Sequence, residues 1–315
     1  MQAPLATHAE RDAAAAGAWH LHEGDEIGPG RHAVRLLGGG RRYEAYLAWD
    51  DELLTLVVAK LLRPNLVGDP AAHAAIEAEA RTLARLHHPV VVRSFGAELA
   101  GRRPHLVLEH LDGPRLSTLL RTSVVAVEQV LTLALQLASA LHYLRRRDTV
   151  HLDLKPRNVI MGGPPRLIDL SIAKATDELA DVRAPLGTRA YMAPEQAHPA
   201  LFPLLGPPAD VWGLGATLYE ALAKRPAFPG GSEAPDAALE ERYPQLVRAP
   251  EPLPADVPAP LAQLVRSCLA FDHAARPAPA ELAAELEELV ARLPRPRLGR
   301  LRPGGRKGES TLSRI

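Results

Sequence analysis

The run HLDLKPRN at residues 151–158, with Asp169 following in LIDLS, constrains the fold of this chain more than any other feature. It gathers carboxylates, an amine and an amide in one short window. Taken alone, such a run predicts a solvated loop, because Asp, Asn and Pro are common in turns. An amphipathic helix leads into it, with apolar residues at helical spacing: Val130, Leu133, Ala134, Leu137, Leu141 and Leu144. The sequence therefore predicts a polar loop held at the end of a buried helix.

Other motifs flank this loop in a fixed order. Before it come LLGGGRRYEAYLA, VVAK ending at Lys60, and IEAEA containing Glu79. After it come GTRAYMAPE, which ends at Glu195, and ARPAPAEL, which contains Arg276. In this order the motifs resemble those of bacterial eukaryotic-like (Hanks-type) serine/threonine protein kinases, over roughly residues 28–292. By that resemblance, residues 151–158 are named the catalytic loop below.

The resemblance implies an α+β, protein-kinase-like fold with two lobes. The N-terminal lobe would hold a five-stranded antiparallel sheet and one helix, and the larger C-terminal lobe would be mostly helical. The strands expected are HAVRLL, YEAYLAW, LLTLVVAK, VVVRSF and HLVLEH, and the helix is expected between Pro70 and His88. In the large lobe, helices are expected at 207–223, 259–270 and 279–293, with a short one at 236–242 in a Pro-rich stretch.

The domain limits follow from the resemblance and, at the two ends of the chain, from composition. Residues 1–27 are Ala-rich and polar without clear periodicity, which predicts a flexible lead. Residues 28–292 form the predicted kinase domain, with the N-terminal lobe at 28–110 and the C-terminal lobe at 111–292. Residues 293–315 are rich in Lys, Arg, Gly and Pro, which predicts a basic disordered tail.

Charge and cysteine content narrow the class of function. Lys plus Arg and Asp plus Glu each number 37, so the chain has no net basic footprint and nucleic-acid binding is not expected. The single Cys268 excludes an internal disulfide and is expected in the core. Neither a secretory signal nor a membrane-spanning segment is evident, since polar residues interrupt the most apolar stretch at 124–144. A cytoplasmic location is expected.

Phosphoryl transfer requires a carboxylate beside the attacking hydroxyl, oxygen ligands for Mg²⁺ and a cation near the phosphates. By the resemblance, Asp153 would accept the proton of the substrate hydroxyl and Lys155 would neutralise the transferring phosphate. Thr188 would lie near Asp153 and help to bind the acceptor. Asn158 and Asp169 would hold Mg²⁺ through side-chain oxygens. Lys155 together with Thr188 resembles the serine/threonine-specific branch, so a protein with a Ser or Thr acceptor is the expected substrate.

The expected phosphate donor is ATP. The resemblance implies that Lys60 grips the α- and β-phosphates and that Glu79 holds Lys60 in place, with Glu77 as the competing carboxylate. Gly38 and Gly40 fall in register with the glycine-rich turn of the family, where glycine lets the backbone approach phosphate. The third glycine position holds Tyr43 instead, whose ring could push the turn outward or weaken nucleotide binding.

The adenine would lie against HLVLEH, which corresponds to the hinge of the family. The resemblance assigns the backbone of Glu109 and Leu111 to face the base, with Leu108 as gatekeeper and Ala45 and Ile160 lining the pocket. Three further residues would be structural: Glu195, which pairs with Arg276, and Asp210, which steadies the catalytic loop.

Two departures bear on regulation. Leu152 stands where many kinases have an Arg that binds a phosphorylated activation loop, and Thr176 is the only hydroxyl residue in the centre of this one. We therefore expect activity that does not require loop phosphorylation. Because no segment resembles a sensor domain, a separate regulatory protein is expected to control it.

Two alternatives remain. The chain could be a pseudokinase or nucleotide-binding scaffold, since Tyr43 and Ser171 replace glycines of the family pattern. It could also be a small-molecule phosphotransferase of kinase-like fold, although the motifs around Glu195 and Arg276 disfavour this. Catalysis is favoured by the retention of four residues: Lys60, Asp153, Asn158 and Asp169.

Overall fold

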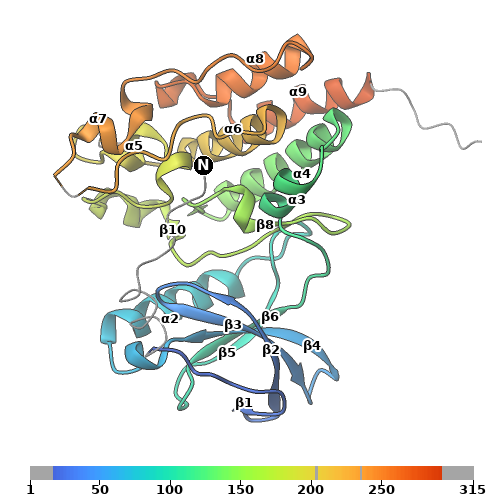
Figure 1. Cartoon of the computed structure of the whole chain (residues 1–315), viewed down its shortest axis with the longest axis vertical. Helices are drawn as coiled ribbons and strands as arrows, with labels where there is room; N and C mark the ends of the chain where they lie inside the picture. Colours follow the sequence, from blue (N-terminus) through green and yellow to red (C-terminus); the bar gives the residue numbers. More distant parts are fainter. Residues whose placement is uncertain (1–16, 203–204, 235, 293–315) are drawn as a thin grey trace, which may run out of the picture.

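The computed structural model describes residues 17–202, 205–234 and 236–292. Within these residues the chain forms two lobes, a sheet with helix α2 and a larger helical part, which lie at opposite ends of the view in Figure 1. The predicted α+β bilobal fold class is confirmed. The predicted tail at 293–315 and residues 1–16 of the predicted lead lie outside the described residues.

Six strands form one antiparallel sheet in the N-terminal lobe, in the order β1-β2-β3-β4-β6-β5. They are β1 (Glu26–Gly28), β2 (Arg31–Gly39), β3 (Tyr43–Asp50), β4 (Thr55–Leu62), β5 (Ser94–Glu98) and β6 (His105–Glu109). The sequence predicts five strands, because the three-residue β1 is too short to show an alternating pattern. The strand predicted at 90–95 is also shifted: residues 90–92 are buried, Val91 makes an isolated bridge, and the paired strand begins at Ser94.

The two faces of the sheet have different neighbours. Opposite residues in antiparallel strands share a face, and Lys60 lies opposite Ala45 on β3 and Leu106 on β6. The segment before β1 packs on the other face, and together with β1 it makes up residues 17–28, which we call the N-terminal strap. Trp19 and Leu21 of the strap pack against that side of the core. The flexible lead predicted up to residue 27 is therefore wrong for residues 17–27, while the outer domain limits remain a prediction.

Helix α2 (Pro70–Ala84) packs beside the sheet. Asp69 caps its N-terminus by accepting a hydrogen bond from the backbone N–H of Ala71, and Pro70 occupies the first turn, where no N–H is needed. One face buries Ile76 and Leu83 together with the carboxylate residue Glu79. The helix thus carries Glu79 toward the interior of the lobe.

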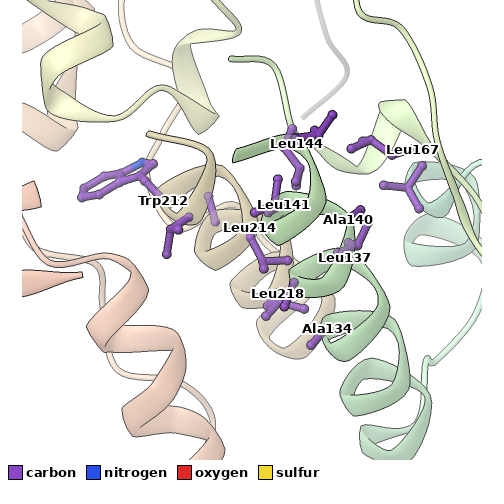
Figure 2. Packing of buried hydrophobic residues seen from close by; sticks show 14 of the residues in the cluster. Ala134, Leu137, Ala140, Leu141, Leu144, Leu167, Trp212, Leu214 and Leu218 are labelled. Carbon is purple, nitrogen blue, oxygen red and sulfur yellow. The ribbon is translucent and has the colours of Figure 1, made fainter. Parts of the chain in front are cut away.

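The C-terminal lobe contains seven α-helices within the described residues: α3 (Leu116–Thr122), α4 (Val127–Arg146), α5 (Pro194–Ala197), α6 (Pro208–Ala223), α7 (Leu239–Arg242), α8 (Ala259–Cys268) and α9 (Pro279–Ala291). Leu137 and Leu141 of α4 lie next to Leu214 and Leu218 of α6, as Figure 2 shows. Cys268 is buried as predicted. Among the helices of the described residues, none has the length and apolar character needed to cross a bilayer.

Short strand pairs fix the loops that leave this core. Strand β7 (Thr149–Val150), just after α4, pairs with β10 (Lys174–Ala175), and β8 (Val159–Ile160) pairs with β9 (Arg166–Leu167). The catalytic loop therefore lies between β7 and β8, and Asp169 lies between β9 and β10. Both loops are held at each end by backbone pairing, which brings their polar side chains to the same region.

Candidate active site

Lys60 lies between two carboxylates that come from different parts of the chain. Its Nζ is 2.8 Å from Oε1 and 2.9 Å from Oε2 of Glu79 on α2, and 2.8 Å from Oδ1 of Asp169. Burial lowers the pKa of Lys60, but these two carboxylates outweigh it and raise the pKa above its ordinary value, so the amine is charged. The competing Glu77 instead pairs with Arg81 on the exposed side of α2.

The carboxylates on either side of Lys60 differ in their own environments. Burial raises the pKa of Glu79, and Lys60 offsets part of that effect. Burial also acts on Asp169, but Lys60 and a hydrogen bond from Ser171 hold the pKa of this carboxyl well below its usual range. Asp169 has a left-handed backbone, with φ at 68°. Asp tolerates this conformation better than most residues, and such strain is common at functional sites.

Asp153 is surrounded by hydrogen-bond donors from three side chains. Lys155 Nζ lies 2.6 Å from its Oδ2, Thr188 Oγ1 donates to its Oδ1 at 2.7 Å, and Asn158 Nδ2 donates to its Oδ2 at 3.0 Å. Asn158 Nδ2 also donates to the Asp153 carbonyl at 2.9 Å. Lys155 Nζ contacts Thr188 Oγ1 at 2.5 Å, which closes a triangle of a carboxylate, an amine and a hydroxyl. The structure thus brings all four of these predicted residues together.

The backbone of the catalytic loop is held by two buried side chains. Asp210 of α6 accepts hydrogen bonds from the N–H groups of His151 and Leu152, at 2.7 and 2.8 Å. Gln196 of α5 donates from Nε2 to the carbonyls of Leu152 and Leu186, both at 2.8 Å. Leu152 itself has φ at 64°, a strained value for a Leu, which these bonds hold in place. Gln196 was missed by the sequence analysis, because nothing around it marks a side chain that bonds distant carbonyls.

The glycine-rich turn, residues 38–43, connects β2 to β3. Gly38 has φ at 150°, and the Gly40 N–H donates to the Tyr43 carbonyl at 2.9 Å. The Tyr43 ring lies over Lys60, with Nζ 4.6 Å from the ring centroid. Burial raises the pKa of Tyr43, and its hydroxyl oxygen is buried without a hydrogen-bond partner among the described residues.

The residues predicted to contact adenine come from several elements. Leu108 is buried on β6 opposite Val58, and the Glu109 N–H donates to the Arg93 carbonyl at 2.9 Å. The other three are partly buried and lie on β3, after β6 and on β8: Ala45, Leu111 and Ile160.

Glu195 and Arg276 form a buried ion pair, as the resemblance implies. Arg276 donates to both oxygens of Glu195, at 2.6 and 2.9 Å, and the two side chains are 0% and 2% exposed. Arg276 also donates to the carbonyls of Ala270 and Pro208. The pair therefore joins the end of the segment that carries Thr188 to α6 and to the loop after α8.

Metal binding here would depend on few protein ligands. Within the described part of the chain, no three His, Cys, Asp or Glu side chains gather in a group that could hold an ion. Asn158 and Asp169 would supply an amide oxygen and a carboxylate. Such a sparse oxygen set is typical of Mg²⁺, which keeps several waters and binds together with phosphates.

The comparisons with known proteins agree with this geometry. The family model described as "Protein kinase domain" matches residues 31–286. The serine/threonine-protein kinase PknA of Mycobacterium tuberculosis strain H37Rv is 32% identical over 260 residues, which cover 78% of this chain and 58% of PknA. PknB of Mycobacterium leprae is 31% identical over 223 residues, 68% of this chain and 34% of PknB. A probable serine/threonine-protein kinase of Streptomyces coelicolor is 33% identical over 218 residues, 66% of this chain and 31% of its own length.

The aligned part of the chain thus spans just over half of PknA and about a third of the other two relatives. The family match nevertheless includes the glycine-rich turn, Lys60, the catalytic loop and Arg276. The order of the motifs, the two-lobed fold and the contacts around Lys60 and Asp153 all agree with this family match. This chain belongs to the protein kinase family, and its relatives are the bacterial Hanks-type serine/threonine kinases.

Proposed function

We propose that this chain binds ATP with Mg²⁺ and transfers the γ-phosphate to a Ser or Thr hydroxyl of a protein. The observation that carries the proposal is the contact of the Asp153 carboxylate with both the Lys155 amine and the Thr188 hydroxyl. A hydroxyl group 2.7 Å from Asp153 marks a position from which a substrate hydroxyl can donate its proton to the carboxylate. The relatives named above are serine/threonine kinases, which supports the same acceptor.

In the proposed step, the acceptor oxygen forms a bond to the γ-phosphorus while the bond from that phosphorus to the β-phosphate oxygen breaks. The acceptor proton passes to Asp153, and ADP leaves. Lys155 lies 2.6 Å from the same carboxylate and supplies positive charge beside the transferring group. Thr188 positions the acceptor against Asp153. The chain's own contribution is thus placement and charge, as phosphoryl transfer requires.

The residues present fit ATP and Mg²⁺. Asn158 uses its Nδ2 on Asp153, so its Oδ1 is the end that remains for a cation. The depressed pKa of Asp169 keeps that carboxyl ionised at neutral pH. An added Cβ at Gly38 or Gly40 would meet no atom within 4 Å, so the turn leaves space beside it. Bound Mg²⁺ would neutralise phosphate charge, while Lys60 holds the α- and β-phosphates and Glu79 holds Lys60.

The base would lie between the lobes. We assign the Glu109 carbonyl and the backbone of Leu111 to its polar edge, and Ala45 and Ile160 to its two faces. Support for this comes from the Glu109 N–H, which is already used on Arg93, and from the register that places Ala45 opposite Lys60. These assignments rest on the family resemblance together with those contacts.

Activity without phosphorylation of the activation segment, residues 169–195, is part of the proposal. Leu152 is buried, and the segment is held by the pairing of β10 with β7, by buried Leu179, and by the bond from Thr188 to Asp153. These contacts order the segment without a phosphate. A separate regulatory protein remains a prediction from the sequence.

One observation favours a second function, a nucleotide-binding scaffold without catalysis. Tyr43 lies over Lys60, the residue proposed to contact the phosphates, and its hydroxyl has no partner among the described residues. If the ring stayed in place when nucleotide bound, it would compete with the phosphates for the amine.

Phosphate incorporation separates the two functions. The purified protein is incubated with Mg-ATP and a generic basic protein, and modified residues are found by mass spectrometry. Asp153→Asn should reduce incorporation about 10³-fold, because it removes the proton acceptor while retaining the shape of the side chain. Asp177→Asn, at an exposed position of the activation segment, is the matched control and should leave the rate unchanged.

Nucleotide affinity is measured on the same samples by calorimetry. Incorporation on Ser or Thr that disappears in Asp153→Asn, with nucleotide binding retained, supports the kinase. Bound nucleotide without any incorporation in the wild type supports the scaffold instead.

A further inference from the structure

Arg63, the residue after β4, contacts three separate parts of the N-terminal lobe. Its Nε donates to the Gly40 carbonyl at 2.6 Å, and its NH1 group donates to the Gly17 carbonyl at 3.2 Å and lies 3.1 Å from Glu44 Oε1. The Arg63 backbone N–H donates to the Arg42 carbonyl at 2.9 Å. We propose that Arg63 is a positioning residue that holds the glycine-rich turn for nucleotide, and that the N-terminal strap holds Arg63.

The strap is fixed to the sheet by polar contacts as well as by packing. The Trp19 N–H donates to Glu44 Oε2 at 3.2 Å, and Trp19 Nε1 donates to the Leu62 carbonyl at 2.8 Å. The Tyr46 hydroxyl donates to the same Glu44 oxygen at 3.2 Å. Glu44 therefore accepts bonds from the strap, from the sheet and from Arg63. Its side chain is only 3% exposed, so all of these bonds are shielded from water.

The turn itself has few bonds of its own. Gly38 and Gly40 allow the backbone more conformations than other residues would, so the turn by itself is less ordered. A charge-assisted bond to the Gly40 carbonyl restricts this freedom, because such bonds are shorter and stronger than neutral ones. Gly39 makes room for it: an added Cβ there would lie 3.2 Å from the NH2 group of Arg63 and 3.1 Å from the Tyr43 carbonyl.

Arg63 is proposed to act by position and not as a phosphate ligand. Its charge is already compensated by Glu44, and its side chain is 14% exposed. The strap contributes residues 17–28, which precede the region matched by the family model at residue 31. The bond from Arg63 to Gly17 therefore joins the matched domain to a segment outside the match. The nucleotide part of the inference rests on the proposed function, whereas the ordering of the turn does not.

The first measurement is hydrogen exchange of the backbone amides of residues 38–43, without nucleotide, in wild type and in Arg63→Met. The Met side chain keeps most of the volume but removes every donor. Exchange in the turn should become about tenfold faster, since a lost charge-assisted bond changes the opening equilibrium by about that factor. Arg81→Met is the control, because Arg81 is also paired with a Glu but lies on the exposed face of α2. It should leave the turn unchanged.

The second measurement is the dissociation constant for Mg-ADP, with the Michaelis constant for the protein acceptor beside it. Arg63→Met should weaken Mg-ADP about tenfold and leave the acceptor constant unchanged. Trp19→Ala should act in the same direction by about threefold. The double variant should be no worse than Arg63→Met alone, because both changes act through the same contacts.

Unchanged exchange in the turn of folded Arg63→Met would overturn the inference, whatever the catalytic result. Additive effects of Trp19→Ala and Arg63→Met would overturn the role of the strap. A wild type that binds no Mg-ADP would contradict the proposed function alone, since the exchange measurement still decides the ordering of the turn. Should Arg63→Met fail to fold, Arg63→Lys keeps the charge for Glu44 but cannot bridge Gly17 and Gly40, and should give faster exchange.

Discussion

The catalytic loop and the glycine-rich turn both bear family motifs, but they are held in different ways. The loop is bonded on every side by residues of the matched domain: Asp210 and Gln196 fix its backbone, and Asn158 fixes Asp153. The turn depends on Arg63, which in turn contacts the N-terminal strap. The loop keeps the family residues, whereas the turn has lost the third glycine to Tyr43.

The difference follows from what each region must do. A loop that positions a proton acceptor needs fixed geometry, and buried bonds to Asp210 supply it from inside the C-terminal lobe. A turn that covers phosphates needs close backbone approach, which glycine allows at the cost of order. Order can then be restored from outside the turn, by residues that the family motif does not contain.

The largest effect is expected from the buried ion pair between Glu195 and Arg276. Arg276→Met leaves Glu195 buried without its partner, which should reduce the free energy of unfolding by about 3–5 kcal/mol. Arg276 is 0% exposed, so water cannot replace the lost bonds. Urea unfolding measures the change. Arg292→Met, which removes an exposed pair with Glu288, is the control and should cost under about 0.5 kcal/mol. A loss as small in Arg276→Met would show that this pair does not support the lobe.

The next largest effect concerns a contact between the two lobes. Lys60 touches Glu79 in the N-terminal lobe and Asp169 beside the catalytic loop. Lys60→Met should reduce kcat/KM for ATP at least about 10²-fold, because a positioned charge is lost from a desolvated site. Steady-state phosphate transfer gives the ratio.

Circular dichroism on the same Lys60→Met sample checks that the fold is intact. A folded variant with wild-type kcat/KM would mean that the phosphates do not depend on this amine. The Tyr43 ring, which lies over that amine, would then not compete with the phosphates for it.

The sequence predicted the contacts of the catalytic loop better than those of the glycine-rich turn, for a physical reason. Asp153, Lys155 and Asn158 lie within one short run, so their mutual contacts are nearly fixed by local spacing. A long, periodic helix such as α4 was also predictable, because apolar residues recur at helical spacing. The three-residue strand β1 and the short helix α5 have no such pattern.

Contacts in which a side chain bonds a distant backbone carbonyl left no signal in the sequence. Arg63 reaches Gly17 and Gly40 through backbone carbonyls, and any residue presents a carbonyl. Gln196 bonds carbonyls in the same way. The contact of the Tyr43 ring was open for a related reason. Alternation along β3 gives the face on which Tyr43 lies, but only the strand register places Lys60 on that same face.

The smallest effect is expected at Thr176, where a phosphate would be needed if the catalytic loop depended on phosphorylation. Thr176 is exposed, and its backbone N–H donates to the Asp148 carbonyl, a bond that Ala retains. The usual cation for a phosphorylated loop is replaced by buried Leu152, so a phosphate at Thr176 would meet no receptor there. Thr176→Ala should keep kcat within about twofold of wild type, measured after phosphatase treatment of both proteins. An inactive Thr176→Ala, together with phosphate found on Thr176 in active wild type, would show that the catalytic loop also depends on a group outside its motif, the phosphate on Thr176.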